Sequence, residues 1–277
     1  MSVISNLVGS LRLFNRRRLY KRFQSKPLEV SSNGFLFSGM KAYMNGTWEP
    51  GTTAVFEKLL VKVSSFVNVG AHHGYFCCIA LKNGVSTVAF EPEKANCAMI
   101  RKHTAANGFD NNFRLFEAAV GSKTSEMKFF GGGDTGTLVK SNSDAPLAQI
   151  NTVDVVKLDD IIKNKDQKLL FLIDVEGFEF NVLEGALSIL SSKVKHYFII
   201  ELWDPVSSNA SEAKNKNFID VFSLMEKKGY RGWKIDETNG DIVEPEIRGQ
   251  LLKNSLARSS SFSNYLFSGK TDTHEFR

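Results

Sequence analysis

The sequence predicts an α/β fold in which helices cover both faces of a mostly parallel sheet. Three observations carry this prediction: short apolar runs alternate with helical runs, a glycine-rich turn follows one apolar run, and acidic residues end several of the runs. Alternation at this spacing is typical of βαβ units, whose strands lie parallel. The length of 277 residues and the hydrophobic content of 42% allow a sizeable core.

The elements follow one another in a regular order. The run from Leu169 to Ile173 is apolar throughout, as expected for a strand at the centre of a parallel sheet. Helical spacing distinguishes the stretches between the strands. We expect strands at 66–70, 87–91, 113–120, 169–175, 196–203, 230–235 and 265–267. We expect helices at 54–63 (capped by Thr52 or Thr53), 75–82, 93–106, 178–191 and 216–228.

Two stretches lack the alternation. Residues 28–50 contain turn signals such as Asn33-Gly34 and are expected to be irregular. Residues 121–168 form a long excursion between the third and fourth strands, which we expect to be a flexible, lid-like surface loop. The predicted organisation is an extension with an irregular lead-in at 1–50, followed by one domain at 51–277.

The basic charge is concentrated at the N-terminus. Residues 1–28 contain seven of the 35 lysines and arginines and no acidic residue, so the remainder has 28 basic against 30 acidic residues. A nucleic-acid-binding face on this remainder is therefore not expected. Residues 1–27 predict an amphipathic helix with a basic cluster, which could lie on an anionic membrane surface. The alternative is a helix that packs on its own domain or on a second protomer of a homo-oligomer.

Other bulk features indicate the compartment. The apolar stretch precedes the basic cluster, which is the reverse of a secretory signal. No apolar run approaches the ~20 residues of a membrane span. The three cysteines are odd in number and lack zinc spacing, which suits a reducing compartment. We expect a cytoplasmic protein, with the inner face of the membrane as a second location.

A glycine-rich turn follows the strand at 66–70, and Glu91 ends the next strand. Glycine lets the backbone approach a ligand, and a carboxylate at this place accepts hydrogen bonds from ribose hydroxyls. In a dinucleotide fingerprint, a further glycine lies between the outer two and admits a pyrophosphate. This chain has His72 between Gly70 and Gly74, and its side chain would crowd a diphosphate. The turn therefore favours S-adenosylmethionine, although a plain tight turn beside a surface glutamate remains the alternative.

A second group of acidic residues follows the strands expected at 169–175 and 196–203. Asp174 and Glu176 come directly after the first of these strands, and Glu201 lies near the end of the second. Ligands bind at the carboxyl ends of strands in open α/β sheets, and buried acids need partners. A ligand with a sulfonium and an ammonium group matches these charges. The alternative is that Asp174 caps the next helix while Glu176 and Glu179 interact with its dipole.

Several short segments occur in the order found in the FkbM family of S-adenosylmethionine-dependent methyltransferases, which the chain resembles from about residue 45 to 267. The segments are Trp48-Glu49-Pro50, Val67 to Gly74, Ala89 to Pro92, Ala119 to Gly121, Val156 to Asp160, Ile173 to Glu179, Val182 to Gly185 and Asn264 to Phe267. The resemblance implies a seven-stranded class I methyltransferase (Rossmann-like) fold. It also implies O-methylation, commonly of hydroxyl groups on sugars or secondary metabolites. Asn68 stands where the family usually has aspartate, and His72 where asparagine is frequent.

The resemblance and the strand-end pattern together give the candidate site. The residues expected to bind the cofactor are Glu49, Asn68, Gly70, Ala71, Gly74, Glu91, Pro92, Ala119 and Asp174. Asp174 is the first candidate for orienting the reactants, while Glu176 and His73 are weaker candidates for a base. His73 also has a simple interpretation as a packing or cofactor-contact residue. A variant in which Asp174, Glu201 and Asp204 hold Mg²⁺ is conceivable, but no spacing requires a metal and none is predicted.

Two other classes of protein compete with the methyltransferase. A nicotinamide-dependent oxidoreductase would need an acid–base pair near the strand at 169–175, and the sequence offers none there. A binding module with a decayed site is the other alternative, which Asn68 favours and the retained Glu91 and Asp174 oppose. The acceptor is expected to be a small molecule or a glycan, and the sequence does not identify it.

Overall fold

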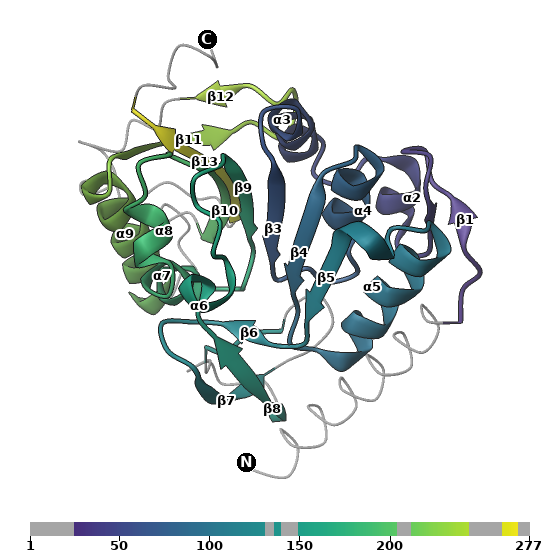
Figure 1. The fold of residues 1–277 in the computed structure, drawn as a ribbon, viewed down its shortest axis with the longest axis horizontal. Coiled ribbons are helices and arrows are strands. Elements are labelled where there is room, and N and C mark those ends of the chain that lie inside the picture. The colour runs from purple at the N-terminus through teal and green to yellow at the C-terminus, as the bar shows by residue number, and fades with distance from the viewer. Residues whose placement is uncertain (1–24, 131–135, 140–148, 204–211, 244–261, 271–277) are drawn as a thin grey trace.

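A central sheet of eight strands organises the computed structural model, which describes residues 25–130, 136–139, 149–203, 212–243 and 262–270 (Figure 1). The strand order is β12-β11-β13-β10-β9-β3-β4-β5. Five of the strands are parallel: β3 (Ser65–Val69), β4 (Ser86–Phe90), β5 (Phe113–Phe116), β9 (Leu169–Ile173) and β10 (Tyr197–Trp203). At the far side, β13 (Phe262–Gly269) runs antiparallel between β10 and β11 (Tyr230–Ile235), and the two-residue β12 (Ile242–Val243) pairs with β11.

Without the short edge strand β12, this is the predicted seven-stranded, mostly parallel sheet, and the class I methyltransferase fold is confirmed. The chain first builds outward from β3 through β4 to β5, and later from β9 to β10 on the other side of β3. The direction therefore reverses between β3 and β9. Ligands of open α/β sheets bind outside the carboxyl ends of the strands at such a point.

Helices cover both faces of the sheet, as predicted. One apolar cluster joins the sheet to α3 (Pro50–Leu60), α4 (Tyr75–Lys82) and α5 (Lys94–Ala106). The second cluster lies on the opposite face, against α7 (Glu179–Glu184), α8 (Leu187–Leu190) and α9 (Glu212–Lys227). Figure 1 shows these two helical layers on the two sides of the sheet. Two further short elements are the helix α6 (Leu158–Ile161) and the 3₁₀ turn η1 (Asp110–Asn112).

Strand register determines which polar side chains share a face. Asn68 on β3 is paired with Leu172 on β9, which belongs to the apolar cluster beneath α3 and α4. Side chains alternate along a strand, so Asp174, two residues beyond Leu172, lies on the same side. On β10, Ile199 pairs with Leu172, and Glu201 follows it by two residues. Three polar side chains from neighbouring strands are therefore brought to one face at the carboxyl edge.

The predicted loop at 121–168 is wrong over much of its length. The expected strand 113–120 divides: β5 ends at Phe116, and β6 (Ala119–Val120) joins a separate three-stranded sheet. In this sheet β8 (Gln149–Val156) is the middle strand, which pairs parallel with β6 and antiparallel with β7 (Ser125–Phe130). This sheet has a small apolar core of its own, which stabilises it away from the main sheet. The Gly131 to Asp134 segment lies outside the described residues.

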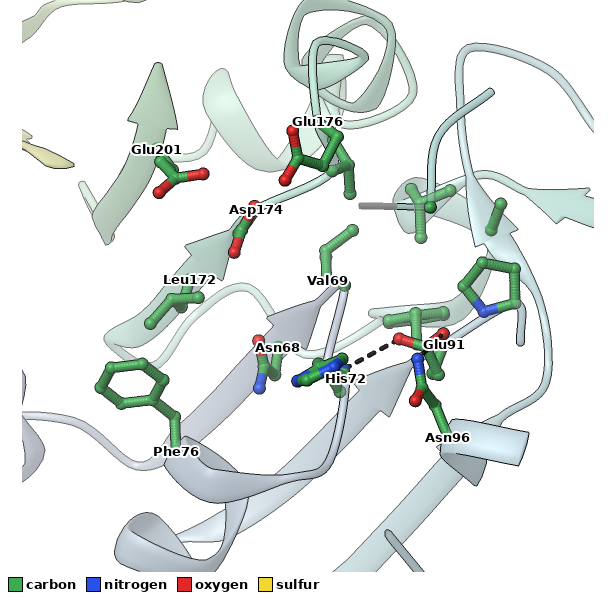
Figure 2. Close-up of a pocket in the computed structure, with 18 of the residues that line it drawn as sticks. Asn68, Val69, His72, Phe76, Glu91, Asn96, Leu172, Asp174, Glu176 and Glu201 are labelled. Atoms are coloured by element: carbon green, nitrogen blue, oxygen red, sulfur yellow. Dashed lines mark hydrogen bonds between the residues drawn. The ribbon is translucent and has the colours of Figure 1, made fainter. Parts of the chain in front are cut away.

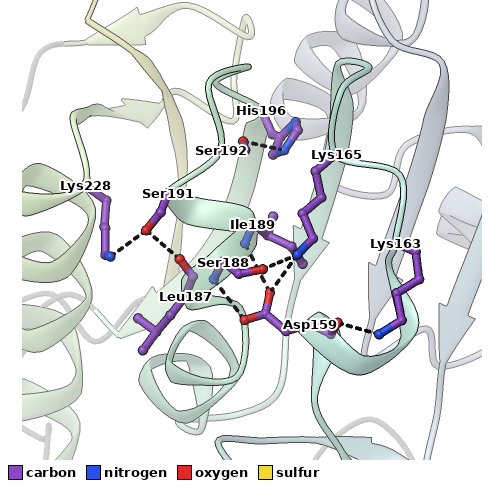
Figure 3. A network of polar contacts seen from close by, with 10 residues as sticks. All are labelled: Asp159, Lys163, Lys165, Leu187, Ser188, Ile189, Ser191, Ser192, His196 and Lys228. Atoms are coloured by element: carbon purple, nitrogen blue, oxygen red, sulfur yellow. Dashed lines mark hydrogen bonds and ion pairs between the residues drawn. The ribbon is translucent and has the colours of Figure 1, made fainter.

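The helix predicted at 178–191 is divided into α7 and α8. Gly185 follows α7, and only glycine fits there, because a β-carbon would lie 2.1 Å from the carbonyl oxygen of Gly121. Asp159 then supplies a new start: its carboxylate accepts hydrogen bonds from the backbone N–H groups of Ser188 at 2.9 Å and Ile189 at 3.1 Å (Figure 3). Helix N-termini have unpaired N–H groups that such a carboxylate satisfies. The acids of the segment from Val156 to Asp160 therefore include a structural cap.

The helix predicted at 54–63 begins earlier, at Pro50, with Glu49 as its N-cap residue. Neither Thr52 nor Thr53 caps it with its side chain. Instead, Glu237 accepts hydrogen bonds from the backbone N–H groups of Gly51 and Thr52, both at 3.1 Å. A residue 185 positions away therefore completes the helix start.

Residues 28–50 are more regular than expected. They form β1 (Glu29–Val30), β2 (Leu36–Phe37) and α2 (Lys41–Asn45), and Phe37 and Tyr43 are buried in the core. The backbone N–H of Ser38 donates to Nε2 of His103 at 3.1 Å, which leaves the ring hydrogen on Nδ1 to donate to the carbonyl of His73 at 2.9 Å. This segment is thereby tied to the glycine-rich turn.

Almost all of the amphipathic helix predicted at 1–27 lies outside the described residues, and the predicted domain boundary at 50 stays a prediction. Within the described residues, no helix has both the length and the apolar character needed to cross a bilayer.

Candidate active site

A cavity of about 280 Å³ lies at the carboxyl ends of β3, β4, β9 and β10, where the chain direction reverses (Figure 2). Five acidic residues are among the described residues that line it, and no lysine or arginine is. The acids are Glu49, Glu91, Asp174, Glu176 and Glu201. A cavity of this charge suits a cationic or hydroxyl-rich ligand and disfavours a diphosphate.

Glu91 is held at the tip of β4 by an unusually complete set of donors. Its Oε2 accepts the backbone N–H of His72 at 2.8 Å, and its Oε1 accepts the N–H of Glu93 at 2.9 Å and the Asn96 amide at 3.0 Å (Figure 2). Only 4% of Glu91 is exposed, and this burial raises its pKa to about 7, against the lowering effect of these hydrogen bonds. The carboxylate is therefore fixed in position, with its remaining lone pairs available to a ligand's hydroxyl groups.

The two glycines of the turn have different roles from those expected. A β-carbon on Gly70 would lie 1.8 Å from the carbonyl oxygen of Asp174, and one on Gly74 would lie 3.2 Å from Ile100. Both have positive φ, at 85° and 80°. Gly70 therefore allows β3 to approach β9, and Gly74, which does not line the cavity, allows α4 to approach α5. Replacing either glycine would test the fold before it tested ligand binding.

A cluster of carboxyl groups forms the opposite end of the cavity. Asp174 and Glu201 are hydrogen-bonded to each other, so one of them is protonated. Burial raises the pKa of both, and the charges of Asp174 and Glu49 raise that of Glu201 further, which makes Glu201 the protonated member. Burial also raises the pKa of Glu49 to about 8, helped by the charges of Asp174 and Glu237 and opposed by a 3.3 Å hydrogen bond from Asn264.

Backbone strain is concentrated around the cavity. Three non-glycine residues among those described have positive φ: Glu49 at 40°, His72 at 50° and Glu176 at 56°. All three line the cavity. Such conformations cost of order 1–3 kcal/mol each and persist where surrounding structure imposes them, often at functional sites.

The alternative in which Asp174 caps the next helix is wrong. Helix α7 begins at Glu179 after Phe178, and the backbone N–H of Phe180 in its first turn donates to Asn217 at 3.0 Å, not to Asp174. Glu179 itself accepts hydrogen bonds from the backbone N–H of Gly177 at 2.9 Å and from Asn217 at 2.6 Å, and it does not line the cavity. Glu179 is thus structural, whereas Asp174 and Glu176 face the cavity.

His73 is poorly suited to act as a base. It is buried, and burial lowers its pKa to about 2, with the neighbouring His72 and His103 lowering it further. A ring with this pKa stays neutral at physiological pH and has little tendency to accept a proton. Packing fits its position, since its ring stacks on that of His72 at 3.9 Å between centroids.

The structure brings together most of the predicted residues. All of them line the cavity except Gly74, while Asp204 of the metal variant lies outside the described residues. The cavity also contains residues that the sequence did not single out as site residues: Tyr43, Phe76, Asn96, Phe129, Thr137, Leu138 and Phe262. Asn96 lies in the first turn of α5, and its separation of five residues from Glu91 along the chain could have indicated it. Phe76 lies directly after the glycine-rich turn, whereas the others come from segments that only the tertiary fold brings to the site.

Comparison with known proteins identifies a family for this chain. The family model described as the methyltransferase FkbM domain matches residues 68–231, which is more than half of the chain and extends from Asn68 past Glu201. No curated protein matches the chain.

Solved structures with a similar course of the chain are distant in sequence. The FkbM methyltransferase from Methylobacillus flagellatus KT is 14% identical, with a TM-score of 0.46 over 75% of this chain and 44% of its own. EvdMO1 is 12% identical, with a TM-score of 0.43 over 92% of this chain and 47% of its own. The O-methyltransferase from Bacillus cereus, in complex with SAH, is 7% identical, with a TM-score of 0.47 over 83% of this chain and 91% of its own. This chain thus spans less than half the length of the first two proteins.

Proposed function

The chain belongs to the FkbM methyltransferase family, and we propose that it transfers a methyl group from S-adenosylmethionine to a hydroxyl of a saccharide, a glycolipid or a related metabolite. The observation that carries the cofactor assignment is Glu91, a buried carboxylate fixed by three N–H donors at the tip of β4. A fixed acceptor at this strand tip suits the hydroxyl groups of a ribose.

The residues present fit this cofactor. S-adenosylmethionine, when bound, supplies a methyl group on a positively charged sulfur. Glu91 would accept the ribose hydroxyls, and the five acids of the cavity match a cation better than a diphosphate. Ala71, Pro92 and Ala119 also line the cavity, and small or apolar side chains such as these suit contact with a flat ring. Asn68, Glu49 and Asp174 supply polar atoms at the opposite end.

The carboxyl cluster fits the acceptor side of the reaction. A hydroxyl oxygen that gains a methyl group must lose its proton, and a positioned base can accelerate the reaction about 10²–10⁴-fold. Asp174 accepts the hydrogen bond in its pair with Glu201, and it is the first candidate for orienting the acceptor and taking its proton. Glu176 is the second candidate. Alignment itself can contribute about 7–11 kcal/mol, which the rigid strand ends of β9 and β10 would favour.

Incubation of the full chain with methyl-labelled S-adenosylmethionine and a panel of acceptors tests this proposal. The panel contains free sugars, nucleotide sugars, glycolipids and amines of matched size. We expect label on a hydroxyl oxygen of a carbohydrate-containing acceptor, identified by mass spectrometry of the product. Label found only on nitrogen, or on no carbohydrate, would contradict the proposed substrate class.

The basic N-terminal segment suggests where the protein acts. We propose that residues 1–27 hold the protein at an anionic membrane surface, because each basic residue there can contribute about 1 kcal/mol of attraction. Co-sedimentation of the full chain and of residues 28–277 with anionic vesicles checks this, and the full chain should bind in a salt-sensitive manner. Equal, salt-independent recovery of both in the supernatant would contradict it.

A further inference from the structure

Three carboxylates at the carboxyl edge of the sheet are close enough to share one ion. Asp174, Glu176 and Glu201 each present an oxygen atom, and these atoms all lie within 4.8 Å of one another. Hard divalent cations bind oxygen ligands at about 2.0–2.6 Å, so two ligands of one ion lie up to about 4–5 Å apart. The three residues therefore need no rearrangement of the backbone to coordinate a single cation. Figure 2 shows them around a common space from β9, the loop after it and β10.

A fourth oxygen points to a ligand at the same place. Asn68 is only 2% exposed, and its amide nitrogen donates to Sγ of Cys77 at 3.3 Å. Its Oδ1 is buried and accepts no hydrogen bond from any of the residues that the structure describes. Leaving a buried acceptor unsatisfied costs roughly 1–3 kcal/mol, so a bound ion or water that interacts with this oxygen would remove that cost. In Figure 2 the amide oxygen is turned toward Asp174, on the face where strand register places both residues.

From these two observations we infer that Asp174, Glu176 and Glu201 bind a divalent cation of the Mg²⁺ or Mn²⁺ type, with the Asn68 amide oxygen as a further ligand or as acceptor for a water on the ion. Carboxylate, amide and water oxygens are the ligands that such ions prefer. Binding of the ion follows from this chain's own residues alone, whereas its role in the reaction rests on the proposed function.

The cation would narrow the class of acceptor. A six-coordinate ion with three carboxylate ligands keeps positions for substrate oxygens or water. A bound hydroxyl loses its proton more readily, because the ion stabilises the developing alkoxide. An acceptor with two neighbouring oxygens, such as a vicinal diol of a sugar, could occupy two of these positions. We therefore expect methylation of one hydroxyl of such a pair.

Titration of the metal-free full chain with Mn²⁺, followed by the loss of the free-ion EPR signal and by calorimetry, tests the site without any turnover. We expect one Mn²⁺ per chain, competed by Mg²⁺. Glu176→Gln and Glu201→Gln should each weaken binding at least tenfold, because each replaces a carboxyl group, which coordinates the ion as the carboxylate, by an amide of the same shape that carries no charge. Asn68→Asp should strengthen it, because a carboxylate replaces the amide oxygen. The exposed Asp166 is remote from the cavity, and Asp166→Asn is the matched control.

The outcomes separate this inference from the proposed function. Binding of S-adenosylhomocysteine is measured in parallel on the same variants with EDTA present, and thermal melts confirm that each is folded. S-adenosylhomocysteine binding without Mn²⁺ binding would overturn the cation site and leave the methyltransferase proposal intact. Mn²⁺ binding that is unchanged in Glu176→Gln, or weakened in Asn68→Asp, would also overturn it. Mn²⁺ binding that these variants alter as expected supports it, even if S-adenosylhomocysteine does not bind.

Discussion

The two ends of the cavity hold their carboxylates in opposite ways. Glu91 accepts three N–H hydrogen bonds, two of them from backbone, and these oppose the rise of its pKa that burial causes. At the other end, burial raises the pKa of Glu49, Asp174 and Glu201, the charge of Asp174 raises that of Glu49 and Glu201 further, and Asp174 and Glu201 share a proton. The Glu91 end is preorganised for neutral hydroxyl groups. The cluster end is suited to bind a positive charge or to exchange a proton.

This contrast separates recognition from chemistry within one cavity. Hydrogen bonds to a fixed carboxylate position a ligand without changing its protonation. A cluster of acids with raised pKa values can accept a proton near neutral pH, where general bases are most effective. Variants at the two ends should therefore fail in different ways.

The largest effect is expected from Asp174→Asn. The amide retains a polar side chain of the same shape but cannot take a proton, so turnover should fall about 10²–10⁴-fold while affinity for S-adenosylhomocysteine changes far less. Labelled methyl transfer and calorimetry on the same preparation measure both quantities. Asp166→Asn, on the exposed surface, should match the parent. A fall in melting temperature with full activity would show that Asp174 is structural. That result would contradict the proposed difference between the two ends of the cavity.

A smaller effect with the opposite signature is expected from Glu91→Gln. Loss of the negative charge weakens the acceptor for ribose hydroxyls, so S-adenosylhomocysteine should bind about tenfold more weakly, a difference of about 1.4 kcal/mol. Turnover at saturating cofactor should be largely retained. Glu117→Gln is the control, since Glu117 pairs with Arg101 at the surface and does not line the cavity. Equal affinity in Glu91→Gln and the parent would contradict the recognition role.

A third effect concerns the pH dependence of stability and not the reaction. Glu49 has its pKa raised from 4.5 to about 8, so the folded state keeps a proton that the unfolded state releases. Its stabilising contribution is therefore complete below about pH 4.5 and is lost as the pH rises toward 8. Glu49→Gln removes this titration, so the parent should lose stability relative to the variant over this range, by at most about 1.4 kcal/mol per pH unit. Denaturant unfolding at several pH values measures the difference, and parallel curves for parent and variant would contradict the charge cluster.

The elements of the βαβ series were predictable because each is encoded locally. Apolar runs bounded by glycine place β3 and β4 within one residue, and the helix at 75–82 matches α4. The break at Gly185 was not predictable, because it depends on a close approach to Gly121 that sequence spacing does not reveal. The cap that Glu237 provides to α3 is likewise a contact between distant segments.

The roles of the acidic residues were also only partly predictable from the sequence. Asp159 and Asp174 both belong to short acidic segments that follow strands, yet Asp159 caps α8 and Asp174 faces the cavity. Strand-end position indicated Asp174 and Glu201 correctly, since parallel strands end at one edge. It did not show that Glu176 completes the cluster from a left-handed backbone conformation. Only the tertiary structure distinguishes a capping acid from one that faces a ligand.

The central claim is that this cavity binds S-adenosylmethionine through the fixed carboxylate of Glu91. Calorimetric titration of the full chain with S-adenosylhomocysteine and, separately, with NADH tests it most directly. We predict one S-adenosylhomocysteine per chain, weaker binding in Glu91→Gln, and no measurable binding of NADH, whose diphosphate would meet a cavity lined by five acids. Tight binding of NADH, or no binding of S-adenosylhomocysteine by the folded chain, would contradict the account.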